Sequence, residues 1–508
     1  MYRILSASKD TYITNKIINN KFRATDANLG SAGTLDLFKL YNENTISGET
    51  NPIEFTRLLI KFPINEITQM DTNGDIDIND TTFKCQVNLH DVYGGQTTPR
   101  NFRAILFPLA KDFDEGPGMD VVKFSDLGAT NFITASISNG VPVTWDLPGA
   151  MKSGSLGESD LDVFVSGSLD GPGGTSTVSL SPSQLFESGK EDLSIDVTRI
   201  VSGTISGQIP DRGFLIAFSG SYEKNSLSYF VKRFASRDAQ IAAIRPKMTV
   251  QFDDCVTDRH SNFVFNVTSS LYLRNYQYGD LANIVSDTAG SSLTGADCMI
   301  LKLESGSFKK TYNVSQALRG RHRVTGLYSA SFAVSSFETL LYDQANLTGS
   351  IQFNATWSNS SETITFLSSS LTINRAERSL SNTQNQNNLL VSLLNVNDEY
   401  DAGEIVNIRV FAENRDRPVR FVKSPYEKKS EIFEQMYYRV RDVADGKILI
   451  DFDKVNNSTK LSTDEDGMFF TFYTDSLPKG RVYAFDFLIR RNNRDTVVKD
   501  AASNFRIV

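Results

Sequence analysis

The chain has 508 residues, of which 40% are hydrophobic and 22% charged, and its formal net charge is -8. This length is enough for several separate cores, because a single core stops growing at about 250–300 residues. The acidic balance argues against a broad basic face for nucleic acid, and no apolar stretch reaches the roughly 18 residues of a membrane span. We therefore expect a globular protein of several domains, with no nucleic-acid or membrane partner.

Short strands dominate the first half of the chain. The segments with the strongest strand pattern are 57–63, 83–89, 103–108, 193–197, 213–218 and 247–252. Within 83–89, Phe83, Cys85, Val87 and Leu89 fall on one face of the strand. Short alternating runs separated by Gly, Asn and Asp are typical of a sandwich or a barrel. A single turn of helix is expected at 182–188.

Ordered motifs in residues 1–254 point to one kind of module. They are ASKDTYI, ATDANLG, FTRLLIKFPI, FDEGPG, VPVTWDLP, EDLSIDVTRIV and the closing series DRGFLIAFS, FVKRFASRDA and RPKMTVQFDD. These motifs resemble the DNRLRE family of modules, which look like jelly-roll carbohydrate-binding modules. The resemblance implies a jelly roll over residues 1–254. In the acidic motif, Phe113 stands where the family usually has Trp, which favours a scaffolding role over sugar stacking.

Two arginines lie beside strands of the buried type, Arg57 and Arg237. Buried guanidinium groups need carboxylate or backbone partners. Asp196 and Asp238 are the candidates that the sequence offers. We expect these charges to hold the fold rather than to bind a ligand.

The run DTNGDIDIND at 71–80 has the oxygen spacing of a calcium loop, with Asp71, Asn73, Asp75 and Asp77 as candidate ligands. The sixth position is Ile rather than Gly, and the twelfth is Thr rather than a bidentate Glu. We expect an acidic surface turn and no cofactor, with a structural calcium ion as the alternative.

The second half of the chain divides at a polar linker. Two Ig-like β-sandwiches are expected, one over 255–375 and one over 390–508, with a linker rich in Asn and Gln over 376–389 between them. Residues 427–439 are the best candidate for a helix, although MYYRVRDV within and after them alternates like a strand. The fold class predicted for the whole chain is all-β, with a jelly roll followed by two further sandwiches.

Basic residues gather late in this acidic chain. They are Arg415, Arg417, Arg420, Lys423, Lys428 and Lys429, followed by RRNNR at 490–494. A solvated loop is the plain interpretation, and an electrostatic docking patch for an acidic partner subunit is the functional one.

The histidines and cysteines offer little support for catalysis. His90, His260 and His322 lie far apart and match no metal or nucleophile motif. The three cysteines are odd in number and lack CxxC spacing, so neither a disulfide framework nor a zinc site is expected. Glycoside hydrolysis needs only two carboxylates, and it is the enzymatic alternative.

The C-terminal third adds a second, weaker resemblance. The layout of DAGEIVNIRVFAENRDRPVR, YYRVRD and KLSTDEDGMFFTFYTDSLPKGRVYAFDFLI is similar to structural proteins of tailed-bacteriophage virions. We therefore predict a non-enzymatic virion component in a tail, neck, baseplate or fibre-adaptor position. It would be assembled in the host cytoplasm, with other virion proteins and further copies of itself as partners. A carbohydrate-binding surface protein that contacts a host glycan is the alternative, and a polysaccharide-degrading enzyme is the next.

Overall fold

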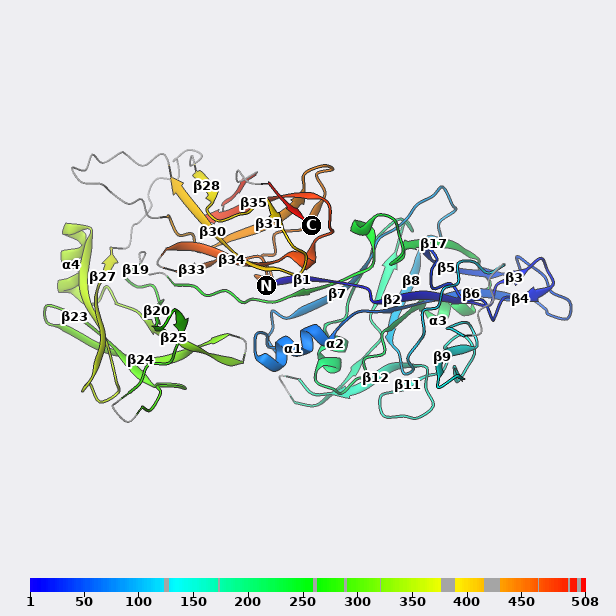
Figure 1. The fold of residues 1–508 in the computed structure, drawn as a ribbon, viewed down its shortest axis with the longest axis horizontal. Coiled ribbons are helices and arrows are strands. Elements are labelled where there is room, and N and C mark those ends of the chain that lie inside the picture. Colours follow the sequence, from blue (N-terminus) through cyan, green and yellow to red (C-terminus); the bar gives the residue numbers. More distant parts are fainter. Residues whose placement is uncertain are drawn as a thin grey trace.

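The protein is all-β, as predicted. The computed structural model describes residues 1–122, 128–171, 174–258, 263–286, 290–319, 321–375, 389–414, 430–464, 466–491, 494–499 and 504–508. These residues form 37 β-strands and four α-helices. Three β-rich parts follow one another along the chain, at the right, the left and the top centre of Figure 1. None of the described helices is long and apolar enough to cross a membrane.

The first part is a jelly-roll sandwich of two antiparallel sheets. One sheet has the order β1 (Tyr2–Ser6), β18 (Lys247–Gln251), β7 (Lys84–Leu89) and β15 (Leu193–Asp196). The other has the order β14 (Ser183–Phe186), β8 (Phe102–Pro108), β16 (Phe214–Phe218), β6 (Ile53–Lys61), β5 (Thr34–Tyr41) and β17 (Tyr229–Ala235), and β2 (Lys9–Thr14) also pairs with β6. The six predicted strands coincide with β6, β7, β8, β15, β16 and β18.

Alternation along these strands builds the first core. In β7, Cys85, Val87 and Leu89 point into the core while the residues between them face outward. Small elements complete this part: β3 (Ile17–Ile18), β4 (Phe22–Arg23), β9 (Thr134–Ser138), β10 (Val141–Thr144), β11 (Ser153–Ser155), β12 (Val163–Leu169), β13 (Ser176–Ser179), α1 (Asn65–Asn73), α2 (Thr198–Ile205), α3 (Gly220–Lys224) and a 3-10 turn at Ala242–Ile244. The buried faces of α1 and α2 pack against the same core.

The middle part is one sheet curled round its own core. Its order is β19 (Phe263–Val264), β27 (Thr365–Asn374), β26 (Ser350–Ser358), β23 (Met299–Ser305), β24 (Phe308–Arg319), β25 (His322–Phe332) and β20 (Ser269–Arg274). The edge strands β19 and β20 are joined by four residues, so the two edges of the sheet must come together. Helix α4 (Thr339–Thr348) and a small hairpin, β21 (Tyr276–Gln277) with β22 (Asp280–Leu281), lie outside this sheet.

The third part is a second two-sheet sandwich. One sheet has the order β28 (Leu389–Leu393), β30 (Ile405–Asn414), β34 (Gly467–Tyr473) and β33 (Ser462–Asp464). The other has the order β29 (Glu399–Tyr400), β37 (Asn504–Ile507), β35 (Val482–Arg491), β31 (Met436–Asp442) and β32 (Ile448–Ile450), with β36 (Arg494–Val498) also paired to β35. A 3-10 turn covers Thr474–Ser476. Stacked aromatic rings, such as Tyr438 on Phe470 at 4.4 Å, fill the core between the sheets.

Two helix predictions are wrong. Strand β31 begins at Met436, inside the helix expected at 427–439, and residues 427–429 lie outside the described residues. Pairing with β35 across the sheet outweighs the local helical spacing, and the strand alternative is correct. The turn expected at 182–188 is strand β14, which pairs with β8. Of the predicted linker 376–389, only Leu389 is described, and it begins β28.

The first and third parts share a contact that runs through strand β1. Ile4 packs into the core of the third part, while Leu5 packs into the core of the first. The Arg3 guanidinium forms an ion pair with Asp475, and the Ile4 N–H donates to Ser476 Oγ at 3.3 Å. In Figure 1 the N-terminus accordingly lies directly against the third part.

Candidate functional site

The arginines singled out in the sequence are paired within the fold. Arg57 donates from Nε and Nη2 to the two carboxylate oxygens of Glu223 at 3.1 and 2.7 Å. Arg237 makes the same two-pronged contact with Glu115, at 3.1 and 2.7 Å. The predicted partners Asp196 and Asp238 are therefore wrong. These carboxylates come from residues more than 100 positions away in the sequence, which no local pattern indicates.

The Asn and acidic motifs of the DNRLRE-like series meet at one place. Asn28 donates from Nδ2 to the carbonyl oxygens of Glu115 and Thr130, at 2.8 and 2.7 Å. Its Oδ1 accepts the N–H groups of Gly30 and Gly118. Every polar atom of this amide is used to join two loops, so the motif has a structural role in this chain.

One carboxyl group beside this junction is unusual. Asp10 is completely buried, and its Oδ1 has no hydrogen-bond partner among the described residues. Burial raises its pKa to about 7, and the charges of Glu115 and Asp238 act in the same direction. The N–H and the guanidinium of Arg237 act against this rise. Asp10 thus changes its charge near neutral pH inside the first core.

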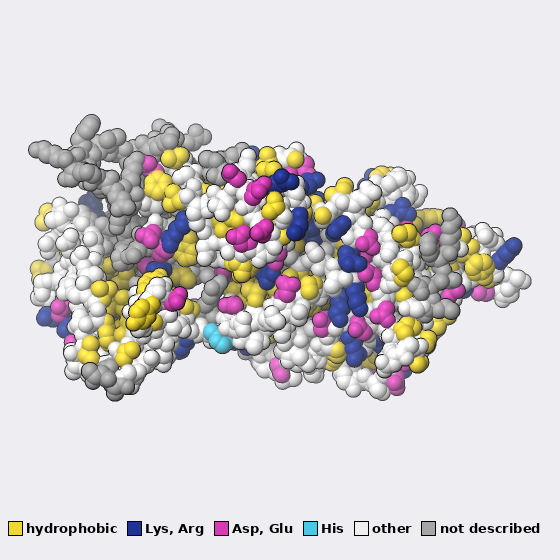
Figure 2. Space-filling model, viewed as in Figure 1, with side chains coloured by type: hydrophobic (Ala, Val, Ile, Leu, Met, Phe, Trp, Pro, Cys, Tyr) yellow, Lys and Arg dark blue, Asp and Glu magenta, His cyan; other side chains and the backbone are white. Residues whose placement is uncertain are grey.

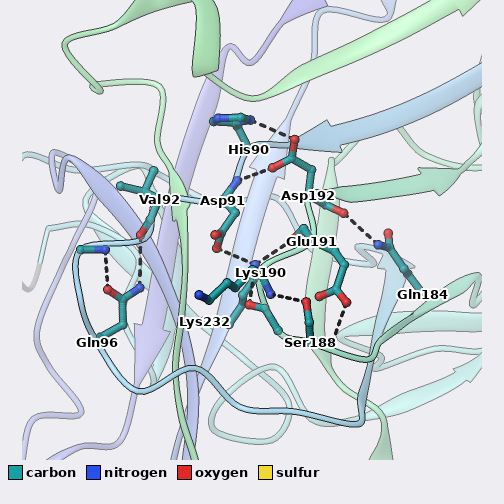
Figure 3. Close-up of polar contacts among 12 residues, drawn as sticks. His90, Asp91, Val92, Gln96, Gln184, Ser188, Lys190, Glu191, Asp192 and Lys232 are labelled. Atoms are coloured by element: carbon teal, nitrogen blue, oxygen red, sulfur yellow. Dashed lines mark hydrogen bonds and ion pairs between the residues drawn. The ribbon is translucent and has the colours of Figure 1, made fainter.

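A buried lysine at another edge of the jelly roll organises a polar network (Figure 3). The Lys232 side chain is fully buried, and Nζ donates to Asp91 Oδ1 at 2.5 Å and to the carbonyl oxygens of Gly189 and Glu191 at 3.0 and 2.8 Å. Burial lowers the pKa of this lysine, while Asp91 opposes that change. Three acceptors match the three N–H groups of an ammonium ion. Lys232 therefore ties a loop to strand β17.

Next to this network, His90 contacts a carboxylate. Its Nδ1 lies 3.0 Å from Asp192 Oδ2. A dashed line in Figure 3 marks this contact. Among the described residues no hydroxyl or thiol is hydrogen-bonded to the other ring nitrogen. His322 lies at the start of β25, far along the chain, and His260 lies outside the described residues. Within the ranges that the structure describes, the histidines are not brought together with a nucleophile.

The predicted calcium ligands lie at the end of a helix. Asp71 and Asn73 belong to α1, and Gly74 ends it with a positive φ of 80°. Arg321, from the β24–β25 hairpin of the middle part, contacts Asp71 Oδ1 at 2.5 Å and Asp77 Oδ1 at 3.9 Å. In the described residues, no group of three or more His, Cys, Asp or Glu could hold a metal. A calcium ion at Asp71, Asn73, Asp75 and Asp77 stays a prediction.

The basic run Arg415, Arg417, Arg420, Lys423, Lys428 and Lys429 lies outside the described residues. The second basic cluster is partly paired: Arg490 lies 3.3 Å from Asp495, and Arg491 lies 2.8 Å from Glu431. On the face drawn in Figure 2, acidic and basic side chains are interspersed.

The most exposed large apolar side chains among the described residues of the middle part lie at two places. The first is the α4 stripe, which we define as Phe337, Leu340 and Leu347, with exposed fractions of 91%, 80% and 88%. Leu340 and Leu347 are seven residues apart, so they lie on the same side of α4. The opposite side of α4, with Ala345 fully buried, packs on the core of the middle part. None of the sequence motifs pointed to this helix.

The second place is the tyrosine hairpin, β21–β22, which we define as residues 276–281. Its turn residues Tyr278 and Gly279 both have positive φ, 54° and 96°, as a type I′ turn requires. Tyr278 is 99% exposed and Tyr276 60% exposed. On the face drawn in Figure 2, hydrophobic side chains gather on the middle part near the strands that Figure 1 labels β20 and β25.

A cavity of about 480 Å³ lies where the first and third parts meet, and we call it the junction pocket. Its lining comes from the start of β7 and the residues before it, from the β13–β14 connection, from the end of β15 and the start of α2, and from a loop of the third part. The lining residues are Thr81, Phe83, Lys84, Ser179, Pro182, Asp196, Val197, Thr198, Arg199, Ile200 and Asn456.

Comparison with known proteins identifies no relative. No family model matches the chain, and no curated protein matches it. Among solved structures, the tandem Ig repeats of Dlar are 9% identical over 50% of this chain and 95% of that one, with a TM-score of 0.15. The N-terminal four Ig domains of Dscam1 isoform 6.9 are 8% identical over 98% and 99% of the two chains, with a TM-score of 0.13. At TM-scores this low, the two likenesses indicate no role for this chain.

Proposed function

We propose that this chain is a non-enzymatic structural component of a tailed-phage virion, which assembles through protein–protein contacts. The observation that carries the proposal is the α4 stripe. Three large apolar side chains within eleven residues are almost fully exposed, whereas soluble monomers rarely expose contiguous apolar patches beyond a few hundred Å². The resemblance of the C-terminal third to virion proteins supports the same role.

The α4 stripe fits the apolar centre of a subunit interface. A buried Phe or Leu side chain contributes on the order of 150 Å², so the three together account for about half of the roughly 800 Å² that each partner buries in a standard interface. Aromatic and aliphatic anchors of this kind carry most of the binding energy in such contacts.

The charges around the stripe indicate what kind of partner fits it. Glu338 and Asp343 flank the apolar side chains on α4, and the helix contains no Lys or Arg. An anionic membrane surface attracts helices with basic residues, so the acidic flanks argue against a lipid partner. We expect a neighbouring protein subunit with an apolar groove and basic residues along its rim.

The tyrosine hairpin supports the same role. A tyrosine in the left-handed region costs about 1 kcal/mol relative to glycine or asparagine, yet Tyr278 occupies that conformation at the tip of a hairpin. Exposed tyrosines on a rigid turn are frequent anchors of protein interfaces. Together, the hairpin and the α4 stripe provide a pair of surfaces through which the middle part can contact its neighbours.

The test has two stages. Mass spectrometry and electron microscopy of purified particles should find the chain as a stoichiometric component, and its absence from particles would refute the virion role. The second stage replaces the chain by the Leu340→Ser, Leu347→Ser variant. The matched control is Val455→Ser, which removes an apolar side chain that is 85% exposed on the third part.

The two variants should give different results. We expect the α4 variant to fold normally but to be depleted from particles by at least tenfold, while the Val455 variant assembles like the unmodified chain. Normal incorporation of the α4 variant would refute the α4 stripe as the assembly contact.

A further inference from the structure

Lys39 is a lysine at a core position of the jelly roll. It lies on β5, where the two-residue period of a strand places its side chain on the inward face with Leu35 and Leu37. The side chain is fully buried, and no carboxylate of the described residues is paired with it. The buried cations Arg57 and Lys232, by contrast, each hold a carboxylate, at 2.7 and 2.5 Å. Lys39 is thus a buried amine without a counter-ion.

Such an amine favours its neutral, nucleophilic form. Burial lowers the pKa of Lys39, and no carboxylate opposes this change. Its Nζ lies beside three oxygen atoms: the main-chain carbonyl oxygens of Asn225 and Leu227, the latter at 2.6 Å, and Oδ1 of Asn225 at 3.1 Å. A neutral amine has two N–H groups, which the two carbonyl oxygens accept, so its lone pair faces the Asn225 carboxamide. A desolvated lysine of this kind is an activated nucleophile.

The carboxamide of Asn225 is held at both of its polar atoms. The Leu227 N–H donates to Oδ1 at 3.1 Å, where negative charge develops when a nucleophile adds to Cγ. Nδ2 donates to the Tyr229 hydroxyl at 2.7 Å, and Tyr229 lies directly opposite Lys39 in the β5–β17 ladder. Because Oδ1 is bonded to Cγ, Nζ lies within about 4.4 Å of the carbon that it would attack.

We propose that Lys39 and Asn225 become joined by an isopeptide bond, which the folded chain forms without an enzyme. Lys39 Nζ adds to Asn225 Cγ, and the Leu227 N–H stabilises the charge on Oδ1. Nδ2 then has a lone pair, to which the Tyr229 hydroxyl gives its proton. Both nitrogens are now bonded to Cγ, so the same hydroxyl takes a proton from Nζ. The Cγ–Nδ2 bond breaks, ammonia leaves and a secondary amide remains. No atom is oxidised or reduced, so the step needs no co-reactant.

The buried position decides which electrophile the amine can meet. A fully buried Nζ is closed to external reagents, whereas a well-oriented internal partner reacts with an effective molarity of about 10⁵ M or more. The bond would join residues 186 positions apart, and it would close a covalent loop around most of the jelly roll. Loops of this length restrict the unfolded chain most strongly. The inference rests on the contacts of Lys39 and does not depend on the proposed virion role.

The first experiment weighs the unmodified full chain. The chain is denatured in reducing buffer, its intact mass is measured, and it is digested for peptide mapping. We expect an intact mass lower than the sequence mass by one ammonia molecule, and a branched peptide that contains both Lys39 and Asn225. Succinimide formation at Asn73 or Asn139, each of which precedes a glycine, would also release ammonia, so the branched peptide decides. Linear peptides around both residues, whatever the intact mass, would overturn the proposal.

The second experiment tests the reacting groups. Asn225→Ala removes the carboxamide and should give only linear peptides. Tyr229→Phe keeps the ring but removes the hydroxyl, and in a time course after cell-free synthesis it should cross-link about a hundredfold more slowly. The matched control Tyr222→Phe removes the hydroxyl of a ring that packs on Tyr229 at 5.7 Å, and it should cross-link like the unmodified chain. Fluorescence of Trp145 checks that each variant is folded. A cross-link at Lys39 in the Asn225 variant, or equal rates in the two tyrosine variants, would overturn the assignment.

Discussion

Replacing Asp10 by Asn should change the pH dependence of the stability of the jelly roll. Asp10 is completely buried on β2, where the Arg237 N–H donates to its Oδ2 at 2.6 Å and the Glu115 carboxylate lies close by. Burial and the charges of Glu115 and Asp238 raise its pKa to about 7. Asparagine keeps an oxygen for the Arg237 N–H and has no charge at any pH.

The sign and the size follow from the raised pKa. The folded state binds the Asp10 proton more tightly than the unfolded state, so stability falls as the pH rises from about 4, and the loss is complete above about pH 7. Because the pKa of Asp10 rises from its ordinary value of 3.8 to about 7, the full loss of stability is on the order of 4 kcal/mol. The free energy of unfolding of the Asp10→Asn variant, measured relative to that of the unmodified protein, should therefore rise by about 2–3 kcal/mol between pH 5 and pH 8.5.

The assay is urea unfolding followed by tryptophan fluorescence. The chain has 2 Trp, so a Trp357→Phe background leaves Trp145, which is 3% exposed in the jelly roll, as the only reporter. Asp211 also has a raised pKa, but its contribution cancels when the variant and its parent are compared at each pH. If the difference in unfolding free energy between the two proteins were the same at pH 5 and pH 8.5, the reasoning about Asp10 would be refuted.

Three further predictions concern the charged contacts. Lys232→Met should destabilise the jelly roll by about 3–5 kcal/mol, because it leaves the Asp91 carboxylate buried and unpaired; adding Asp91→Asn should restore some of this loss in urea unfolding, and no restoration would contradict the pairing. Arg321→Gln should cost only about 0.5–1 kcal/mol but should speed hydrogen exchange in α1, and unchanged exchange would argue against this contact between the first and middle parts. Arg237→Lys should lower the urea midpoint of the jelly roll, since a lysine cannot form the two-pronged contact with Glu115; an equal midpoint would show that the fork geometry is unimportant.

Polar contacts within the protein explain why the DNRLRE-like motifs have a structural role in this chain. Arg57, Arg237 and Asn28 each join segments that are far apart in the sequence, and their polar groups are used within the protein. A residue whose donors are already satisfied has little left for a ligand.

Much of the fold could be predicted because strand formation depends on neighbouring residues. The alternation of Cys85, Val87 and Leu89 predicted β7, and the same reasoning located β6, β8, β15, β16 and β18. The helix expected over 427–439 failed because Met436 and Tyr438 pair with strand β35, about 50 residues later. Helix α4 was not predicted, since its buried side rests on Ala345 and two half-buried residues, which leaves a weak periodic pattern.

The sequence by itself determined the all-β class, the strands of the first part and the presence of arginines that need partners, because alternation and residue chemistry are local properties. Tertiary structure alone decided which carboxylates those arginines meet, that Arg321 contacts Asp71 at the predicted calcium run, and that Lys84 and Arg199 share a cavity with Asn456. Each of these contacts joins residues separated by more than 100 positions. Their pairing is set by how whole sheets pack, and no local pattern records it.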